Sequence, residues 1–197
     1  MDRPWVALPW LLILLTAVPA AEALKKKTPD AEELFNPLLG PDYAFWLVGP
    51  IYHMASDREV EDFLNLLDDS EAKAFIEAFW QERNKGTKIF QDTPQQIFDQ
   101  RAVEADKRFT ENVYPGRRSD RGTLLILYGE PKEITFESPK RSGDPPFEVW
   151  SYGTDASPGL DGRKPKKSYR LIELDGSTVF WANQHIRRKP GLSRNPF

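Results

Sequence analysis

Two carboxylates and a cluster of arginines are the residues of this sequence whose types and spacing point most directly to chemistry. Arg117, Arg118, Asp120 and Arg121 lie together in the run GRRSDRG, and Glu130 follows shortly after an apolar segment. Glycosidases use two carboxylates held at a set separation, so Asp120 and Glu130 are the candidate catalytic residues of a hydrolase. The sequence does not give the distance between these two carboxylates. An enzyme is therefore one of two hypotheses, and the other is a binding domain without catalytic activity.

The arginine cluster also allows two interpretations. In the first, its cations bind an anion. In the second, Asp120 caps or bridges a helix while the arginines cover the end of a preceding helix, and this accounts for all four charges without a ligand. The second interpretation is favoured. The candidate binding residues are Arg117, Arg118, Ser119, Asp120, Arg121 and Tyr128.

Other catalytic and metal-binding patterns are not indicated. The sequence has no cysteine, and His53 and His185 lie far apart without a partner at ligand spacing. Since zinc takes three or four nitrogen, sulfur or carboxylate ligands, we predict neither a metal site nor a cofactor. Ser119 does not lie in the G-x-S-x-G pattern of a nucleophile elbow. A net charge of −3 gives no indication of nucleic-acid binding.

The segments Gly116–Gly122 and Leu125–Pro131 resemble the GWxTD domain, a family whose signature is GWxTD followed by RG, an apolar strand and YGxP. Arg117 replaces the tryptophan of that signature and Ser119 its threonine, while Asn84 stands at a position that is usually aspartate. The resemblance covers roughly residues 45–135. It implies a bacterial, mostly extracytoplasmic protein, and it implies no activity, because none is established for the family. Further matching positions are Phe75, Ile76, Phe79, Trp80, Arg83, Ala105, Arg108 and Phe109.

Three amphipathic helices are predicted to precede the motif. Ser56 and Glu59 form a capping box ahead of apolar residues at helical spacing. A second helix is expected to start near Asp69 or Ser70 and to end at Asn84-Lys85-Gly86. Thr93-Pro94 opens a third, which should last to about Asn112.

The apolar run Thr123–Tyr128 predicts a short strand buried on both faces, because it is bounded by Gly122 and by Gly129-Glu130-Pro131. Asp175-Gly176 predicts a hairpin. The sequence thus indicates an α+β fold in which N-terminal amphipathic helices pack on a mostly antiparallel β-sheet. Between its strands, the loop Gly153–Lys167 is long enough to be functional or disordered. The further predicted strands are Glu133–Glu137, Phe147–Tyr152, Tyr169–Leu174 and Thr178–Asn183.

The N-terminal residues predict a location outside the cytoplasm. Arg3, the apolar run Val6–Val18 and Ala21-Glu22-Ala23 are typical of a signal peptide, residues 1–23, with an uncleaved membrane anchor as the alternative. Residues 24–42 are expected to form a linker, residues 43–186 the domain and residues 187–197 a basic disordered tail. The expected location is periplasmic or secreted, with membrane contact only if the first segment is retained.

Together these observations predict an exported domain that binds a partner protein or an envelope polymer. The alternative is an envelope hydrolase that uses Asp120 and Glu130.

Overall fold

The computed structural model describes residues 29–88, 91–111, 114–139 and 145–181. The predicted signal peptide, residues 1–23, and the predicted basic tail, residues 187–197, lie outside these ranges, as does His185.

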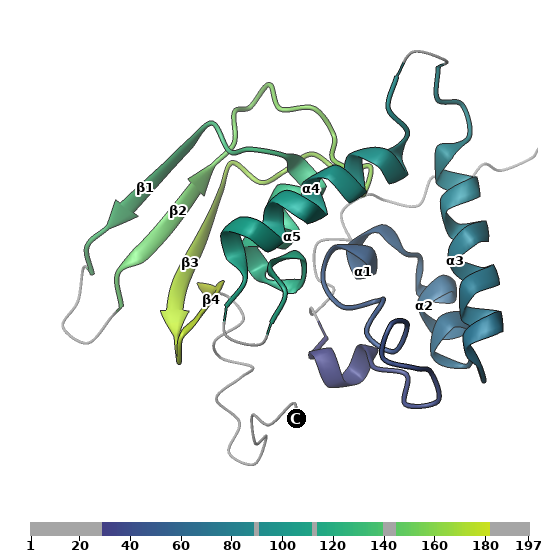
Figure 1. Cartoon of the computed structure of the whole chain (residues 1–197). Helices are drawn as coiled ribbons and strands as arrows, with labels where there is room; N and C mark the ends of the chain where they lie inside the picture. Colours follow the sequence, from purple (N-terminus) through teal and green to yellow (C-terminus); the bar gives the residue numbers. More distant parts are fainter. Residues whose placement is uncertain (1–28, 89–90, 112–113, 140–144, 182–197) are drawn as a thin grey trace, which may run out of the picture.

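Helices and strands occupy separate parts of the molecule, which confirms the α+β class (Figure 1). Two short 3-10 helices, η2 and η3, supplement the α-helices. The helical elements are η2 (Ala31–Leu34), α1 (Pro50–Met54), α2 (Asp57–Leu64), α3 (Asp69–Asn84), α4 (Pro94–Phe109), η3 (Gly116–Arg118) and α5 (Asp120–Tyr128). The strands are β1 (Glu133–Glu137), β2 (Phe147–Ser151), β3 (Ser168–Leu174) and β4 (Ser177–Phe180).

The sheet is an antiparallel meander in the order β1-β2-β3-β4. The predicted hairpin is confirmed: Asp175 and Gly176 have φ angles of 50° and 76°, and two positive values are what a type I′ turn requires. The turn joins β3 to β4 and sets Leu174 opposite Ser177.

Local capping determines where the predicted helices begin. Ser56 Oγ accepts a hydrogen bond from Glu59 N at 3.3 Å, and Glu59 Oε2 accepts one from Ser56 N at 2.7 Å. Thr93 and Gln96 form a second capping box at the start of α4. Each box satisfies backbone donors that a helix start otherwise leaves without a partner.

The prediction of a buried strand at Thr123–Tyr128 is wrong, because this segment belongs to helix α5. The helix begins one turn earlier than the apolar run, at Asp120, and Gly129 ends it with a φ of 78°. Thr123–Leu127 is buried continuously, so α5 has no polar face that would reveal helical periodicity. An isolated helix of nine residues is marginal in water, and the surrounding core therefore stabilises this one.

Two apolar clusters divide the core, and α5 contributes to both. One contains η2 and α1–α3 without any strand residue, and it includes Leu127 of α5. The other joins α4 and Leu124–Ile126 to Trp150 and Leu171 of the sheet. The helices that pack on the sheet are therefore α4 and α5, whereas α1–α3 form a layer beyond them (Figure 1).

Part of the segment expected to be a linker belongs to the folded domain. Leu34 and Leu39 are buried in the first cluster. Asn36 is also buried, and its Nδ2 donates to Phe63 O at 3.1 Å and to Leu66 O at 3.0 Å. These contacts hold residues 34–39 against the C-terminal end of α2 and the residues that follow it.

An ion pair within the helical layer predicts how stability changes in acid. Arg83 donates to both oxygens of Glu59, at 2.9 and 3.0 Å, and to Met54 O at 2.8 Å. The hydrogen bonds from Arg83 are the main cause that lowers the pKa of Glu59 from 4.5 to about 2. As the pH falls, Glu59 is therefore protonated more readily in the unfolded chain than in the folded protein. The ion pair stabilises the fold fully above pH 4.5, and this stabilisation is lost as the pH falls towards 2.

We expect Glu59→Gln to lower the urea midpoint at neutral pH and to flatten its decline between about pH 5 and pH 2. Glu61→Gln, on the same helix, is the control, and its profile should follow that of the wild type. Equal acid sensitivity of the wild type and Glu59→Gln would contradict this role of the pair.

Candidate functional site

The GRRSDRG turn holds α5 against α4 at very short range. A Cβ atom on Gly116 would lie 1.9 Å from Ala105 O, and one on Gly122 would lie 1.9 Å from Gly116 O. Ser119 is the N-cap of α5, since its Oγ accepts from Gly122 N at 2.9 Å and donates to Gly116 O at 2.7 Å. The two glycines and the serine thus serve close packing and capping.

Asp120 and Arg121 connect the start of α5 to the sheet. Phe180 N donates to Asp120 Oδ2 at 2.6 Å, so Asp120 bridges to β4 while Ser119 caps the helix. Arg121 pairs with Glu111 and, at 3.5 Å, with Glu148. These two carboxylates also accept hydrogen bonds, from Thr178 N at 2.8 Å and from Trp150 Nε1 at 2.6 Å respectively. The network therefore joins α5 to β2 and to the β3–β4 hairpin.

Arg117 and Arg118 lie over α4 and the helical layer. Arg117 Nε donates to Asp106 Oδ2 at 2.7 Å, and this hydrogen bond works against the effect of burial to lower the pKa of Asp106. The Arg118 guanidinium stacks over the Phe45 ring, 5.2 Å from its centre. Partial burial lowers the pKa of Arg118. Of the two interpretations, this arrangement favours the one in which the arginines cover the preceding helix.

The opposite end of α5 is tied to α4, to the sheet and to the long loop. Arg101 Nη1 donates to Ile126 O at 2.9 Å, which satisfies a carbonyl at the helix end. Tyr152 donates its hydroxyl hydrogen to Gly129 O at 3.1 Å. Tyr128 donates to Asp161 Oδ2 at 2.8 Å, while Leu160 N donates to Leu127 O at 2.9 Å.

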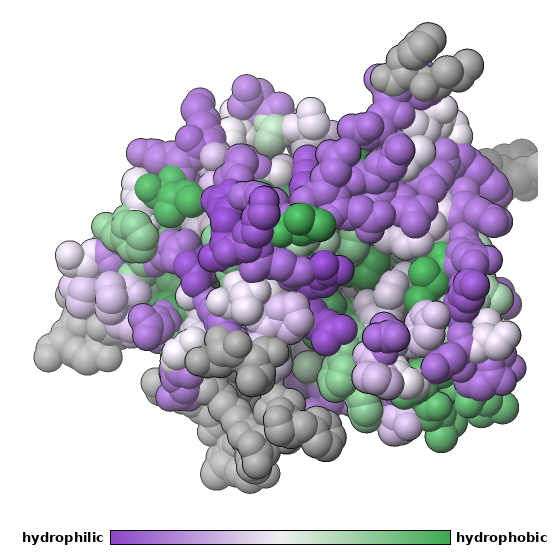
Figure 2. Space-filling model, viewed as in Figure 1, coloured by the Kyte–Doolittle hydropathy of each residue, from purple (hydrophilic) through white to green (hydrophobic). Residues whose placement is uncertain are grey.

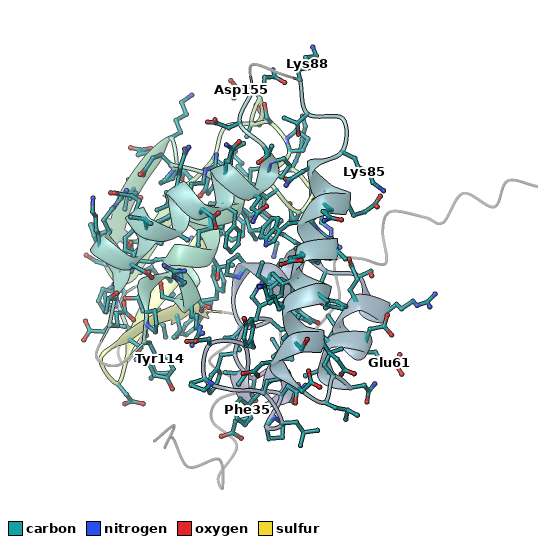
Figure 3. The ribbon with its side chains drawn as sticks, turned by 45° about the vertical axis from the view of Figure 1, so that its right-hand side comes forward. Phe35, Glu61, Lys85, Lys88, Tyr114 and Asp155 are labelled. Atoms are coloured by element: carbon teal, nitrogen blue, oxygen red, sulfur yellow. The ribbon has the colours of Figure 1, made fainter. Side chains whose placement is uncertain are left out.

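A pocket of about 450 Å³ opens at this end of α5. Arg101 and Ile97 line it from α4, and the loop from Gly153 to Leu160 forms another wall. Figure 3 shows Asp155 of this loop at the opposite end of the molecule from Tyr114, which lies two residues before Gly116 of the GRRSDRG turn. The remaining lining residues are Leu127, Tyr128, Glu130, Lys132 and Tyr152.

The structure separates most of the predicted site residues from this pocket. Tyr128 and Glu130 line it, whereas the predicted binding residues of the GRRSDRG turn lie at the other end of α5. Because a helix rises 1.5 Å per residue, the two ends of the nine-residue α5 lie about 12 Å apart. Asp120 accepts the hydrogen bond of Phe180 N, whereas Glu130 pairs with Arg108 at the pocket, so the structure does not place these two carboxylates in one site.

Sequence reasoning did not find several residues of the pocket. Arg101 appears only as one polar residue of an amphipathic helix, and Tyr152 only as the end of a predicted strand. Lys132 and Asp155 lie in connections whose course depends on tertiary packing. The length of the loop Gly153–Lys167 was the one available signal, because long loops often carry binding residues.

The ionisable groups of the pocket are suited to binding more than to proton transfer. Burial raises the pKa of Tyr128 and of Tyr152, so both hydroxyls stay protonated at neutral pH. Glu130 is occupied by an ion pair with Arg108 at the exposed rim. In the described ranges, no three His, Cys, Asp or Glu residues gather where they could hold a metal ion.

The fold and the motif define an α+β domain in which a glycine-bounded turn anchors a central buried helix. A family model for the GWxTD domain matches residues 42–159, which is more than half of the chain. The protein belongs to the GWxTD domain family. Comparison with curated proteins and with solved structures found no match.

The match extends the resemblance into β2 and the long loop, and it leaves the β3–β4 hairpin outside. Arg117, which stands where the family signature has tryptophan, bonds to Asp106. Of the helices in the described residues, none is both long and apolar enough to cross a bilayer.

Proposed function

We propose that this protein is an exported binding module that recognises a partner protein or an envelope polymer through the pocket at the C-terminal end of α5. The observation that carries the proposal is the composition of this pocket. Tyr128 and Tyr152 offer aromatic surface, while Arg101, Lys132 and Asp155 offer charges of both signs. Such a mixture of aromatic and convergent polar groups is typical of ligand sites.

The pocket is preformed, which reduces the entropy cost of binding. Its loop wall is held by the hydrogen bonds from Leu160 N to Leu127 O and from Tyr128 to Asp161. Leu160 also packs against both apolar clusters. Of the two interpretations of the Gly153–Lys167 loop, these contacts support the functional one.

The location outside the cytoplasm rests on the sequence alone. The apolar run Val6–Val18 and the small residues at Ala21 and Ala23 support cleavage and release into the periplasm or the medium. Mass spectrometry of the mature N-terminus tests this part separately, and a chain that keeps residues 1–23 in the cytoplasm would contradict it.

The geometry favours a binding module over the hydrolase alternative. Asp120 accepts the hydrogen bond of Phe180 N and lies far from the pocket, so it has no access to a ligand held there. Of the two predicted catalytic residues, Glu130 lines the pocket and Asp120 does not.

The pocket is tested by cross-linking the tagged full-length protein in the cells that produce it. Ser157 is exposed and lines the pocket, whereas Thr154 is exposed on the same loop outside the lining. We expect Ser157→Trp to reduce the recovered partner about tenfold, equivalent to about 1.4 kcal/mol of binding free energy. Thr154→Trp should recover as much as the wild type. Undiminished recovery with Ser157→Trp would overturn the proposal.

A further inference from the structure

The first strand of the sheet, β1, has one edge without a described partner. β1 pairs with β2 along its whole length, from Glu133 opposite Ser151 to Glu137 opposite Phe147. It is at one end of the sheet order, and no strand of the described residues lies on its other side (Figure 1). The outward N–H and C=O groups of such an edge are ready to pair with another chain.

β1 also carries the most exposed large apolar side chain in the described part of the protein. Phe136 is 77% exposed and Ile134 is 39% exposed. Ile134 stands opposite Trp150, which is fully buried, so both residues of β1 lie on the face of the sheet that the helices cover elsewhere. Figure 2 shows this hydrophobic surface over β1. The helices α4 and α5 cover Trp150 and leave Phe136 in water.

The opposite face of β1 is acidic. Glu133, Thr135 and Glu137 alternate with the two apolar residues and therefore point to the other side of the sheet. Glu137 forms an ion pair with Arg170 at 3.1 Å. Glu133 has no ion pair or hydrogen bond to another side chain in the described ranges, which leaves its charge available to a neighbouring strand.

We propose that the outer edge of β1 is a docking site for an extended segment of a partner protein in which apolar residues alternate with lysine or arginine. Main-chain hydrogen bonds to β1 would supply affinity, as in other cases of strand addition. The apolar residues of the segment would cover Phe136 and Ile134, and its cations would face Glu133. The proposal rests on the proposed role as a binding module and assigns a second surface to it.

Charge argues against a second copy of this chain as the occupant. If two β1 strands paired antiparallel over all five residues, Glu133 of each copy would stand opposite Glu137 of the other. Like charges placed directly opposite across two strands are destabilising. β1 contains no lysine that would repel a basic partner, and it contains no proline that would interrupt main-chain pairing.

The test uses a labelled synthetic peptide in which valine and phenylalanine alternate with lysine, titrated with the purified full-length protein. Fluorescence anisotropy should show saturable binding that weakens about tenfold with Phe136→Lys, because the apolar contact is lost and a like charge is added. The matched control is Leu67→Lys, since Leu67 is 67% exposed on the helical layer and receives the same charge. It should bind as the wild type does.

The proposal is overturned by equal binding by Phe136→Lys, by equal binding of a peptide with glutamate in place of lysine, or by equal binding of a peptide whose alternate amides are methylated. Sedimentation of the wild type as a dimer that Phe136→Lys dissociates would make a second copy the occupant instead. Loss of peptide binding with Ser157→Trp but not with Phe136→Lys would place recognition in the pocket, so that this proposal fails and the proposed function stands.

Discussion

Replacement of Gly122 by alanine is expected to destabilise the protein by about 3 kcal/mol, at the upper end of what an added methyl group costs in a packed core. The new Cβ would lie 1.9 Å from Gly116 O and 2.8 Å from Gly116 C. Both are backbone atoms, so no rotamer change can relieve the overlap. A loss of stability would distinguish this steric overlap from an effect of helix propensity, because Gly→Ala within a helix otherwise stabilises a protein by roughly 1 kcal/mol.

Urea unfolding of the purified protein measures the effect, with Gly86→Ala as the control. Gly86 has a φ of 81°, and no atom lies within 4 Å of the position that an added Cβ would take. This substitution should therefore cost only about 1 kcal/mol of backbone strain. If Gly122→Ala fails to fold, its soluble yield compared with that of Gly86→Ala gives the same ranking. A Gly122→Ala protein as stable as the wild type would mean that the turn does not bind α5 as tightly as described.

Replacement of Arg121 by methionine is expected to cost about 3–5 kcal/mol, because it leaves two largely buried carboxylates without their cation. Glu111 and Glu148 are only 13% and 15% exposed, and both depend on Arg121 as the cation between them. Arg121 Nε is itself buried without a hydrogen-bond partner in the described residues, so the wild-type network already includes one unfavourable group.

Arg117→Met is the matched control for this experiment. Arg117 lies in the same turn, but its ion pair with Asp106 is exposed, and such pairs contribute roughly 0–1 kcal/mol. Adding Glu148→Gln to Arg121→Met should recover part of the loss, since glutamine is neutral and still accepts the hydrogen bond of Trp150 Nε1. Equal unfolding free energies for Arg121→Met and Arg117→Met would contradict a buried role for Arg121.

These expectations bear on how the family motif is interpreted. Gly116, Ser119 and Gly122 serve the turn, and Asp120 and Arg121 serve the connection to the sheet. The motif thus places α5, and α5 in turn carries the pocket at its other end. Recognition is proposed for the pocket and for β1, whereas the residues of the GRRSDRG turn position α5 and do not line the pocket.

The local features of the fold were predictable because their physical causes lie within a few residues. The capping boxes at Ser56 and Thr93 and the Asp175-Gly176 turn each depend on groups one to three positions apart, and the structure confirms all three. The third helix, expected to last to about Asn112, ends at Phe109.

The candidate site was less predictable, because its partners are distant in sequence. Arg121 meets Glu111 and Glu148, and Tyr128 meets Asp161, only after the sheet and the loop have folded back onto α5. The two predicted catalytic residues are close in the sequence, but Asp120 lies at the start of α5 and Glu130 lies just beyond its C-terminal end.

The sequence by itself determined the α+β class, the starts of α2, α3 and α4, the hairpin and the membership of the GWxTD family, since these depend on local chemistry and on an ordered motif. Only the tertiary structure decided that Thr123–Tyr128 is helical, that α4 and α5 are the helices of the described residues that pack on the sheet, and where the pocket lies. The reason is that α5 is buried on every side. An apolar segment without a polar face carries no periodicity, so its conformation follows from the elements that enclose it.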